Sequence, residues 1–315
     1  MGRFLLKRVG LALITLVLIS IAVFAVGQVL PGDVGRTILG PFATNAQVAN
    51  LDHQMGMDRP LPVRYWDWIS GFFRGNWGQS YLLNVPVRPI VGQRLLSSLA
   101  LGAFALLLIV PVSIGLGVVA ALGYGKSVDR VISITGLSLI ALPEFVVGVI
   151  LLVVFAVQLH WFPSSSSVPS WNPVDIVRQF LLPSIPLMLV LFGYISRMAR
   201  AGTVVALQSN YVRTAVLKGL PRSVVIWRHV LRNSLLPTIS VISVQVGYLV
   251  GGLVVTETLF NYPGIGKLVL DSAVGHDLPM LEATVLTVAV IYMVSNLVAD
   301  LLLAMLNPRI RLSDR

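Results

Sequence analysis

The chain has 315 residues, of which 56% are hydrophobic and 11% charged, with a mean hydropathy of +0.86 and a net charge of +10. Soluble domains carry about 25% charged residues, so this composition excludes an ordinary soluble protein. The sequence contains no cysteine, which excludes disulfides, thiolate metal sites and a cysteine nucleophile.

Long apolar stretches recur along the chain, and a membrane-spanning helix needs about 20 such residues. Six stretches qualify, and they are residues 9–30, 99–123, 131–159, 181–198, 235–258 and 284–306. The third is long enough to tilt or to continue beyond the lipid. The fourth is the weakest, because Pro183 and Pro186 interrupt its start. We therefore predict an all-α membrane protein with about six transmembrane helices.

The first apolar stretch follows basic residues, as a signal peptide would. Its length of about 22 residues exceeds the 7–15 of a signal peptide, so we expect a retained helix. After it comes a long loop, residues 31–97, which is rich in aromatic residues: Tyr65, Trp66, Trp68, Phe72, Phe73 and Trp77. This loop is a cap at the membrane interface, where Trp and Tyr are enriched, or a docking surface for an external partner; the two readings are compatible.

These boundaries divide the chain into three parts. Residues 1–30 hold the N-terminus and first helix, residues 31–97 form an external loop domain, and residues 98–315 form the core with transmembrane helices 2–6. The core includes a loop at residues 199–234, which we call the basic loop.

Lys and Arg predict the orientation, because they are enriched in cytoplasmic loops. Fifteen of the 23 fall in segments that share one side: Arg3, Lys7, Arg8, Lys126, Arg130, Arg197, Arg200, Arg213, Lys218, Arg222, Arg228, Arg232, Arg309, Arg311 and Arg315. This distribution predicts a multi-pass protein of the plasma (inner) membrane with both termini in the cytoplasm. Topology accounts for the positive charge, so no nucleic-acid partner is needed.

The basic loop contains no acidic residue and predicts two short helices. Asn210 can cap the first, and Gly219 followed by Pro221 ends it. Its side chains divide between an apolar face, with Val212, Ala215, Val216 and Gly219, and an opposite face, with Arg213, Thr214, Leu217 and Lys218. This pattern is typical of an interfacial helix or of a docking element.

The second helix of the basic loop, residues 222–232, is a basic amphipathic helix of the kind that lies at a membrane surface. On an α-helical wheel its apolar arc contains Val224, Ile226, Trp227, Val230 and Leu231, and its polar arc contains Arg222, Arg228, His229 and Arg232. Val225 is the exception to this division.

Several motifs together resemble the permeases of ABC importers. The stretches Tyr211-Val212-Arg213-Thr214-Ala215, Lys218-Gly219-Leu220-Pro221 and Leu235-Leu236-Pro237 are similar to the cytoplasmic coupling loop of these permeases. Arg213-Thr214-Ala215 occupies the place of their Glu-Ala-Ala motif, as in the peptide-permease branch. Residues 256–267, Leu142-Pro143-Glu144-Phe145 and Asn307-Pro308-Arg309-Ile310-Arg311 also match, so the resemblance covers essentially the whole chain.

The chain is thus identified as a member of the dipeptide/oligopeptide family, which includes nickel and glutathione importers, and it looks like the first, "B"-type permease. The resemblance implies a type I ABC importer permease fold and four kinds of partner: a similar second permease, two cytoplasmic ATPases, an external substrate-binding protein and membrane lipid. It also implies that the ATPases bind ATP and Mg, with no cofactor in this chain. The implied ATPase-coupling residues are Arg213, Thr214, Ala215, Leu217, Lys218 and Gly219.

The remaining motifs bear on phosphate binding, helix packing and transport. Gly125-Lys126-Ser127 lacks the earlier glycine and the preceding strand of a phosphate loop. Gly115-x-Gly117-x-x-Ala120 lies within an apolar span and favours close helix packing. Glu144 is a candidate for lining a translocation path, whereas solvation near the external surface explains Glu257. No His, Asp and Glu spacing predicts a metal site, and no catalytic set is present.

Two other functions compete with an ATP-driven importer. A stand-alone ion-coupled secondary transporter is favoured by inverted repeats and buried carboxylate relays, and the sequence shows no repeat and few buried acids. A membrane-embedded enzyme needs a nucleophile–base set at membrane depth, and none is apparent. We therefore expect a non-catalytic, pore-forming subunit of an importer whose cargo the sequence leaves open.

Overall fold

The computed structural model of this chain describes residues 2–29, 39–40, 42–54, 56, 58–167, 170 and 172–306. Within these ranges the named elements are all helices, and the β-pairing consists of an isolated bridge between Gln79 and Pro86. The helices are α1 (Gly2–Val29), α3 (Asn45–Gln54), α4 (Leu61–Phe73), α5 (Val87–Leu122), α6 (Ser127–Ala141), α7 (Glu144–Leu151), η1 (Leu152–Gln158), α8 (Pro173–Leu207), α9 (Asn210–Leu217), α10 (Arg222–Val224), η2 (Val225–Leu231), α11 (Arg232–Ser234), α12 (Leu236–Leu259), α13 (Ile265–Val274) and α14 (Leu278–Leu306).

The chain forms two compact units. The first combines Met1–Leu99 with Pro263–Val294, and the second combines Ala100–Tyr262 with Ser295–Arg315. The domain boundaries predicted at residues 30 and 97 are based on the expected membrane spans, and they stay a prediction. The C-terminal motif at residues 307–311 and the basic residues Arg309, Arg311 and Arg315 lie outside the described residues.

The all-α membrane fold is confirmed. By length and composition, four described helices can cross a membrane (within α1, α5, α8 and α14), and there is a fifth if the bent pair of α6 with α7 and η1 counts as one span. The sixth predicted span coincides with α12, whose apolar stretch Leu236–Gly247 is shorter. Each of the six apolar stretches therefore forms helix, although the helices extend beyond several of the predicted bounds.

The third predicted span is not one continuous helix, which corrects the expectation for residues 131–159. The chain is extended at Leu142 (ψ 127°), α7 begins after Pro143, and the two helical parts are bent by 97°. The cause is the proline ring, which disfavours the α-helical conformation of the preceding residue. As a result, Glu144 lies at the first turn of a new helix.

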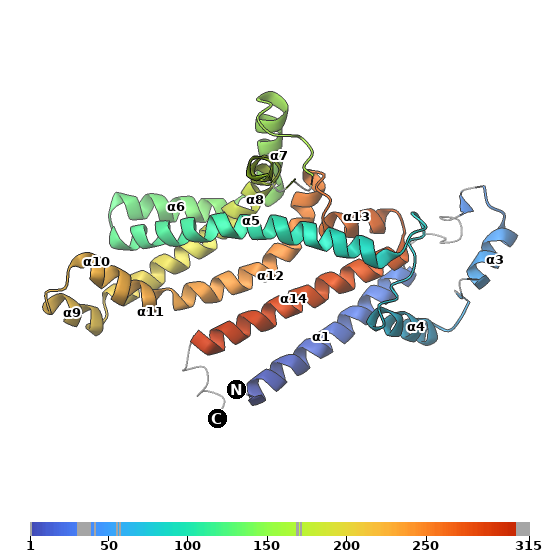
Figure 1. Ribbon diagram of the computed structural model, residues 1–315, viewed down its shortest axis with the longest axis horizontal. Helices are drawn as coiled ribbons and strands as arrows, with labels where there is room; N and C mark the ends of the chain where they lie inside the picture. The colour runs from blue at the N-terminus through green and yellow to red at the C-terminus, as the bar shows by residue number, and fades with distance from the viewer. Residues whose placement is uncertain are drawn as a thin grey trace. The chain divides into compact units, whose positions relative to one another are not determined.

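The helix α8 forms the centre of the second unit and continues through both of its prolines. The helix α8 packs against α6, α12 and α7, and Figure 1 shows it beside α6 and α12. Pro183 and Pro186 are buried, and packing of this kind compensates for the hydrogen bonds that proline removes. The main core cluster is made of Leu101, Ile109, Phe180, Leu187, Leu191, Phe192, Ile195, Leu249, Leu253 and Tyr262.

Small residues bring helices of the second unit close together, as the Gly115–Ala120 pattern predicts. A Cβ atom on Gly117 would collide with the Ser196 carbonyl and with Ala199 of α8. Ala120 is fully buried, whereas nothing lies within 4 Å of a Cβ on Gly115. The close contact between α5 and α8 therefore depends on Gly117.

The first unit is held by aromatic packing between α1 and α4. The Ser20 and Tyr65 hydroxyls lie 2.7 Å apart, and the Phe24 ring is 5.5 Å from that of Tyr65 and 5.9 Å from that of Trp68. Phe72 stacks on Trp77 at 4.7 Å, but Trp66 and Phe73 remain exposed. The aromatic group of the long loop is thus divided between packing and exposure, which suits both readings of it.

A buried carboxylate joins distant parts of the first unit. Asp277 accepts hydrogen bonds from the Ser80 hydroxyl and from the backbone N–H groups of Tyr81 (3.1 Å), Leu82 (3.5 Å) and Met280 (3.4 Å). The same side chain therefore fixes the 80–82 turn and begins α14.

Candidate functional site

The first helix of the basic loop, α9, has no side-chain cap at its start and ends at a glycine. Asn210, predicted to cap α9, is instead its first helical residue. Ser209 precedes it, and the Ser209 side chain bonds to the Ala206 carbonyl instead of capping α9. At the other end Gly219 has φ +71°, and the N–H groups of Gly219 and Leu220 bond to the carbonyls of Val216 (2.9 Å) and Ala215 (3.4 Å). This pair of bonds is a Schellman motif, which confirms the predicted stop at Gly219.

The buried face of α9 is narrower than the predicted apolar face. Val212 and Ala215 are buried, and they form a small core with Ala206, Val225 and Val230. Val216 was expected on the same face, but it is exposed.

The second helix of the basic loop departs from the α-helical wheel. Residues Val225–Leu231 form the π-helix η2, in which residue i pairs with residue i+5. Val225 and Val230 therefore share a face, and both are buried. Trp227, predicted on the apolar arc, is 75% exposed. The exception on the wheel, Val225, is in fact central to the packing.

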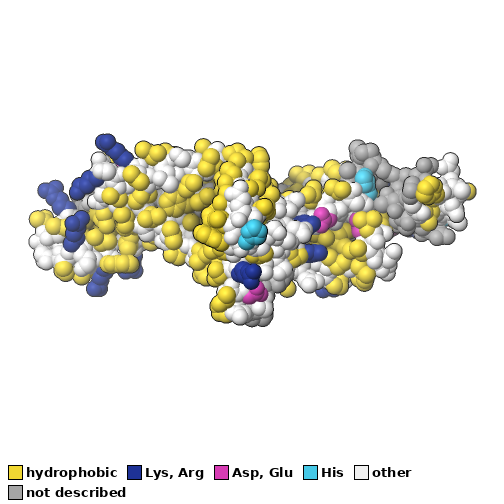
Figure 2. All heavy atoms as spheres, turned by 90° about the horizontal axis from the view of Figure 1, so that it is seen from above, with side chains coloured by type: hydrophobic (Ala, Val, Ile, Leu, Met, Phe, Trp, Pro, Cys, Tyr) yellow, Lys and Arg dark blue, Asp and Glu magenta, His cyan; other side chains and the backbone are white. Residues whose placement is uncertain are grey.

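Four of the sequence-predicted coupling residues lie together on the exposed side of α9. Arg213, Thr214 and Lys218 are exposed, and the Leu217 side chain is 80% exposed. Ala215 instead packs in the small core, so its contribution to this surface is indirect. Figure 2 shows Lys and Arg side chains at the end of the second unit that holds α9 and α10, with no Asp or Glu visible beside them.

A groove that sequence reasoning did not predict lies beside α9. It has a volume of about 370 Å³ and is lined by residues that include Val205, Tyr211 and Pro237. Gly202 of α8 also lines it, and a Cβ atom there would collide with the Ser234 carbonyl. This contact holds the end of the basic loop against α8.

Sequence reasoning missed an ion pair between Arg200 of α8 and Asp129 of α6. Arg200 binds the buried Asp129 with two nitrogen atoms, and Asp129 also accepts from the Gly125 N–H (2.9 Å) and the Ser133 hydroxyl (3.3 Å). The Arg200 guanidinium lies 5.3 Å from the centre of the Tyr124 ring. The only sequence signal was an acid between two basic residues in a short turn.

The candidate path residue Glu144 is hydrogen-bonded to a residue of α12. The Thr256 hydroxyl donates a hydrogen bond of 2.8 Å to Glu144, and Thr256 is buried while Glu144 is partly exposed. The neighbouring Glu257 is fully buried, which corrects the expectation that it is solvated. Among the described residues, no three His, Asp or Glu side chains gather closely enough to hold a metal ion.

Comparison with known proteins places this architecture in a family. The family model described as "Binding-protein-dependent transport system inner membrane component" matches residues 113–312, and the model of its N-terminal part, "Binding-prot-dependent transport system membrane comp, N-term", matches residues 1–93. The first match contains α8, α12 and the basic loop.

Curated relatives match over nearly their full length. The chain is 33% identical to the "Probable peptide ABC transporter permease protein y4tP" of Sinorhizobium fredii, with 99% of this chain and 100% of that protein covered. It is 34% identical to the "Glutathione transport system permease protein GsiC" of Salmonella choleraesuis and 33% identical to that of Escherichia coli K12, with 99% of both chains covered. The chain therefore belongs to the family of binding-protein-dependent transport system inner membrane components, and it is a non-catalytic, multi-pass permease subunit of an ABC importer.

Proposed function

We propose that this permease carries di- or oligopeptides across the membrane, and that the exposed side of α9 is where ATPase subunits bind. The observation that carries the proposal is the 80% exposure of Leu217 beside Arg213, Thr214 and Lys218. An exposed apolar side chain surrounded by positive charge, on a helix fixed from behind, suits a docking surface that an acidic-rimmed groove covers.

The packing of α9 suggests how a movement of this helix reaches the rest of the second unit. The buried face of α9 is fixed to η2, and Gly202 and Ser234 hold the end of the loop against α8. Because α8 continues from Pro173 to Leu207 without a break, a displacement of α9 is carried along α8 into the core of the second unit. ATP-driven closure of two ATPases can in this way change access to the path, near which we place Glu144.

The remaining parts of the proposal concern partners and orientation. We infer that the basic loop and both termini are cytoplasmic, since most Lys and Arg fall on that side. A second, similar permease completes the path, an external binding protein delivers cargo, and ATP and Mg are bound by the ATPases alone. Peptide cargo is chosen because the relatives are named for peptide and for glutathione, which is itself a small peptide.

Copurification tests the assembly. The tagged chain, extracted from its host membranes with mild detergent, is expected to recover a second permease and ATPases, with hydrolysis stimulated by a binding protein loaded with peptide. An untagged strain is the control. A chain that purifies without ATPases and moves solute down an ion gradient would overturn the proposal.

A further inference from the structure

The second unit contains a small pocket between α6 and α8, which we call the α6–α8 pocket. The two helices pack side by side (Figure 1), and all of the residues that line the pocket belong to one or the other. Its volume is about 220 Å³, below the range of about 300–1,000 Å³ that sites for whole small molecules occupy. A pocket of this size suits one chemical group of a larger molecule.

Two contacts between the helices bound the pocket along the chain. At one of them a Cβ atom on Gly193 would collide with the Gly136 carbonyl, so the backbones approach closely there. At the other, Arg200 of α8 pairs with Asp129 of α6. Ser196 lies between Gly193 and Arg200 on the face of α8 that lines the pocket. The pocket therefore has a fixed floor and fixed side walls.

Arg197 is the cation of this pocket that lacks an acidic partner. Its side chain is exposed and lines the pocket, and it makes no hydrogen bond or ion pair within the part of the chain that the structure describes. The positive charge of Arg200, which also lines the pocket, is balanced by Asp129. None of the described lining residues is acidic. The pocket therefore carries a net positive charge and favours an anion.

The Ser196 hydroxyl offers a second donor to such an anion. Ser196 is only 4% exposed, and its hydroxyl has no hydrogen bond among the described residues. It faces α6, because a Cβ atom built on Gly136 would lie 3.5 Å from Ser196 Oγ. The nearby Ser133 hydroxyl is instead occupied, since it donates to Asp129 at 3.3 Å. A buried hydroxyl without a partner costs free energy, so an acceptor oxygen from outside the chain fits beside it.

A phosphate group matches both donors. Its several oxygens carry negative charge, and an arginine can bind two of them at once. Arg197 and Ser196 are neighbours on α8 and line the same pocket. A phosphate can therefore accept hydrogen bonds from both side chains together.

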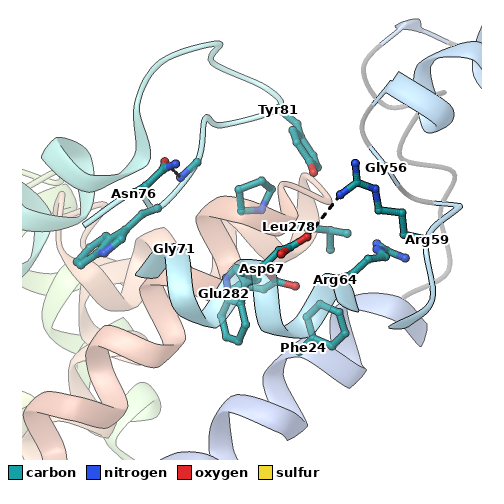
Figure 3. Close-up of a pocket in the computed structure, with 14 residues that line it drawn as sticks. Phe24, Gly56, Arg59, Arg64, Asp67, Gly71, Asn76, Tyr81, Leu278 and Glu282 are labelled. Atoms are coloured by element: carbon teal, nitrogen blue, oxygen red, sulfur yellow. Dashed lines mark hydrogen bonds and ion pairs between the residues drawn. The ribbon is translucent and has the colours of Figure 1, made fainter. Parts of the chain in front are cut away.

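The larger pocket of the first unit, drawn in Figure 3, lacks this preference for an anion. It has a volume of about 490 Å³, and its lining residues include the acids Asp67 and Glu282 as well as Arg59 and Arg64. Asp67 and Arg59 pair with each other at 3.5 Å. Because charges of both signs line this pocket, it does not select a ligand by charge as the α6–α8 pocket does.

Exposed apolar side chains beside the α6–α8 pocket favour a lipid as the source of the phosphate. Leu137 lines the pocket and is 51% exposed, and Ile134 of the same helix is also exposed. Ser133 lies six residues after Ser127, where α6 begins, which is about 9 Å along the helix. This depth is comparable to the headgroup layer, about 5–8 Å thick on each side of the bilayer. Free phosphate would gain nothing from the apolar surface.

We propose that the α6–α8 pocket binds the headgroup phosphate of an anionic phospholipid, with Arg197 and the Ser196 hydroxyl on the phosphate oxygens and an acyl chain along Leu137. Basic pockets between membrane helices on the cytoplasmic side bind such headgroups. The inference rests on the proposed function only for the cytoplasmic orientation of this end of α8. The lipid would then bind the helix through which the proposed movement of α9 passes.

Lipid binding to the purified full chain in mild detergent tests this site. The chain is titrated with phosphatidylglycerol, or with phosphatidylcholine, whose headgroup has no net charge, and bound lipid is counted by native mass spectrometry. We expect phosphatidylglycerol to bind about tenfold more tightly or better. Arg197→Gln should weaken phosphatidylglycerol binding by about tenfold, because charge-assisted hydrogen bonds are lost. It should remove most of the preference over phosphatidylcholine.

Three further variants keep the test decisive. Ser196→Ala should weaken phosphatidylglycerol binding by about threefold, through the loss of one hydrogen bond. Gly136→Ala changes no charge and places a methyl group in the pocket with no contact closer than 3.5 Å, so it should also weaken binding. Arg178→Gln is the matched control, because it removes an exposed arginine near the other end of α8. It should change the affinity by about twofold or less.

Several outcomes would overturn the lipid site. Equal binding of phosphatidylglycerol and phosphatidylcholine would do so, as would equal weakening by Arg197→Gln and Arg178→Gln. Displacement of the lipid by millimolar inorganic phosphate would show a site for a free anion. Arg197→Gln that leaves lipid binding intact but lowers recovery of a second permease would make an acidic side chain of that permease the occupant.

The orientation is tested separately, so the two failures can be told apart. The chain contains no cysteine, and Lys126 is exposed near the start of α6. Lys126→Cys in sealed inverted membrane vesicles should react with a membrane-impermeant maleimide. Labelling only from the opposite side would refute the proposed orientation, whereas selective binding of phosphatidylglycerol in detergent would still support the pocket.

Discussion

The basic loop and the surroundings of Asp277 in the first unit place their polar groups in opposite ways. In the basic loop the charged side chains of α9 face outward, and a core of five small or β-branched residues lies beneath them. In the first unit the Asp277 carboxylate is buried and accepts hydrogen bonds from Ser80 and from three backbone N–H groups. A surface with exposed apolar and basic groups suits a protein partner, whereas a buried carboxylate with a full set of hydrogen bonds suits a structural role.

The sharpest way to break this comparison is to place a negative charge on the exposed side of α9. Leu217→Asp should abolish peptide uptake while insertion and expression stay normal, because the charge would be buried when an ATPase covers α9. We expect ATPase binding to weaken by about a hundredfold, or about 3 kcal/mol. Pull-down of ATPases and uptake assays on the same membranes measure both effects.

Leu217→Met is the matched control, since it keeps the volume and apolar character of the side chain. It should retain uptake and ATPase recovery. Normal uptake by a well-expressed Leu217→Asp protein would remove this face of α9 from the coupling surface.

The first unit depends on buried polar contacts, and Asp277 tests that side of the comparison. Asp277→Asn should lower the free energy of unfolding by about 2–3 kcal/mol, because the turn at residues 80–82 loses a charged acceptor. Denaturation in mixed micelles measures the change. Asp271→Asn, which removes an exposed pair with Lys267 at 3.1 Å, should cost about 0.5 kcal/mol or less, and equal effects of the two variants would contradict the assignment.

Substitutions in η2 should have a smaller effect, which is measured as a change in the rate of hydrogen exchange. Val225→Ala should speed hydrogen exchange in residues 210–231 by about tenfold, because about 1–2 kcal/mol of buried apolar contact is lost. Trp227→Ala should change exchange by about twofold or less, since Trp227 is 75% exposed. An ideal α-helix predicts the reverse order, so this pair of variants separates the two geometries.

Local sequence patterns predicted what depends on local interactions. Apolar runs located each membrane helix, and Gly219 with Pro221 located the end of α9, because chain solvation and backbone conformation decide these features. Proline was ambiguous: Pro183 and Pro186 are accommodated within α8, whereas Pro143 breaks its span. The difference lies in the packing around each ring, which no single stretch of sequence contains.

The features that escaped prediction join residues distant in sequence or depart from ideal geometry. Asp129 meets Arg200, and Asp277 meets the turn at Ser80, over separations that one sequence without relatives cannot reveal. The π-helix η2 changed the face of Trp227, because a wheel assumes 3.6 residues per turn. For the candidate site, the exposed positions of Arg213, Thr214, Leu217 and Lys218 followed from the sequence, whereas Ala215 proved to be core.

The smallest predicted loss of stability is at the end of α9, where a substitution strains only the backbone conformation. Gly219 has φ +71°, and nothing lies within 4 Å of a Cβ atom built there. Gly219→Ala should therefore destabilise the end of α9 by about 1 kcal/mol through conformational strain without any steric clash. Gly219→Asn should cost less, because asparagine tolerates this conformation. Hydrogen exchange at residues 215–220 ranks the two variants, and equal protection in both would mean that the Schellman motif does not hold the docking helix in place.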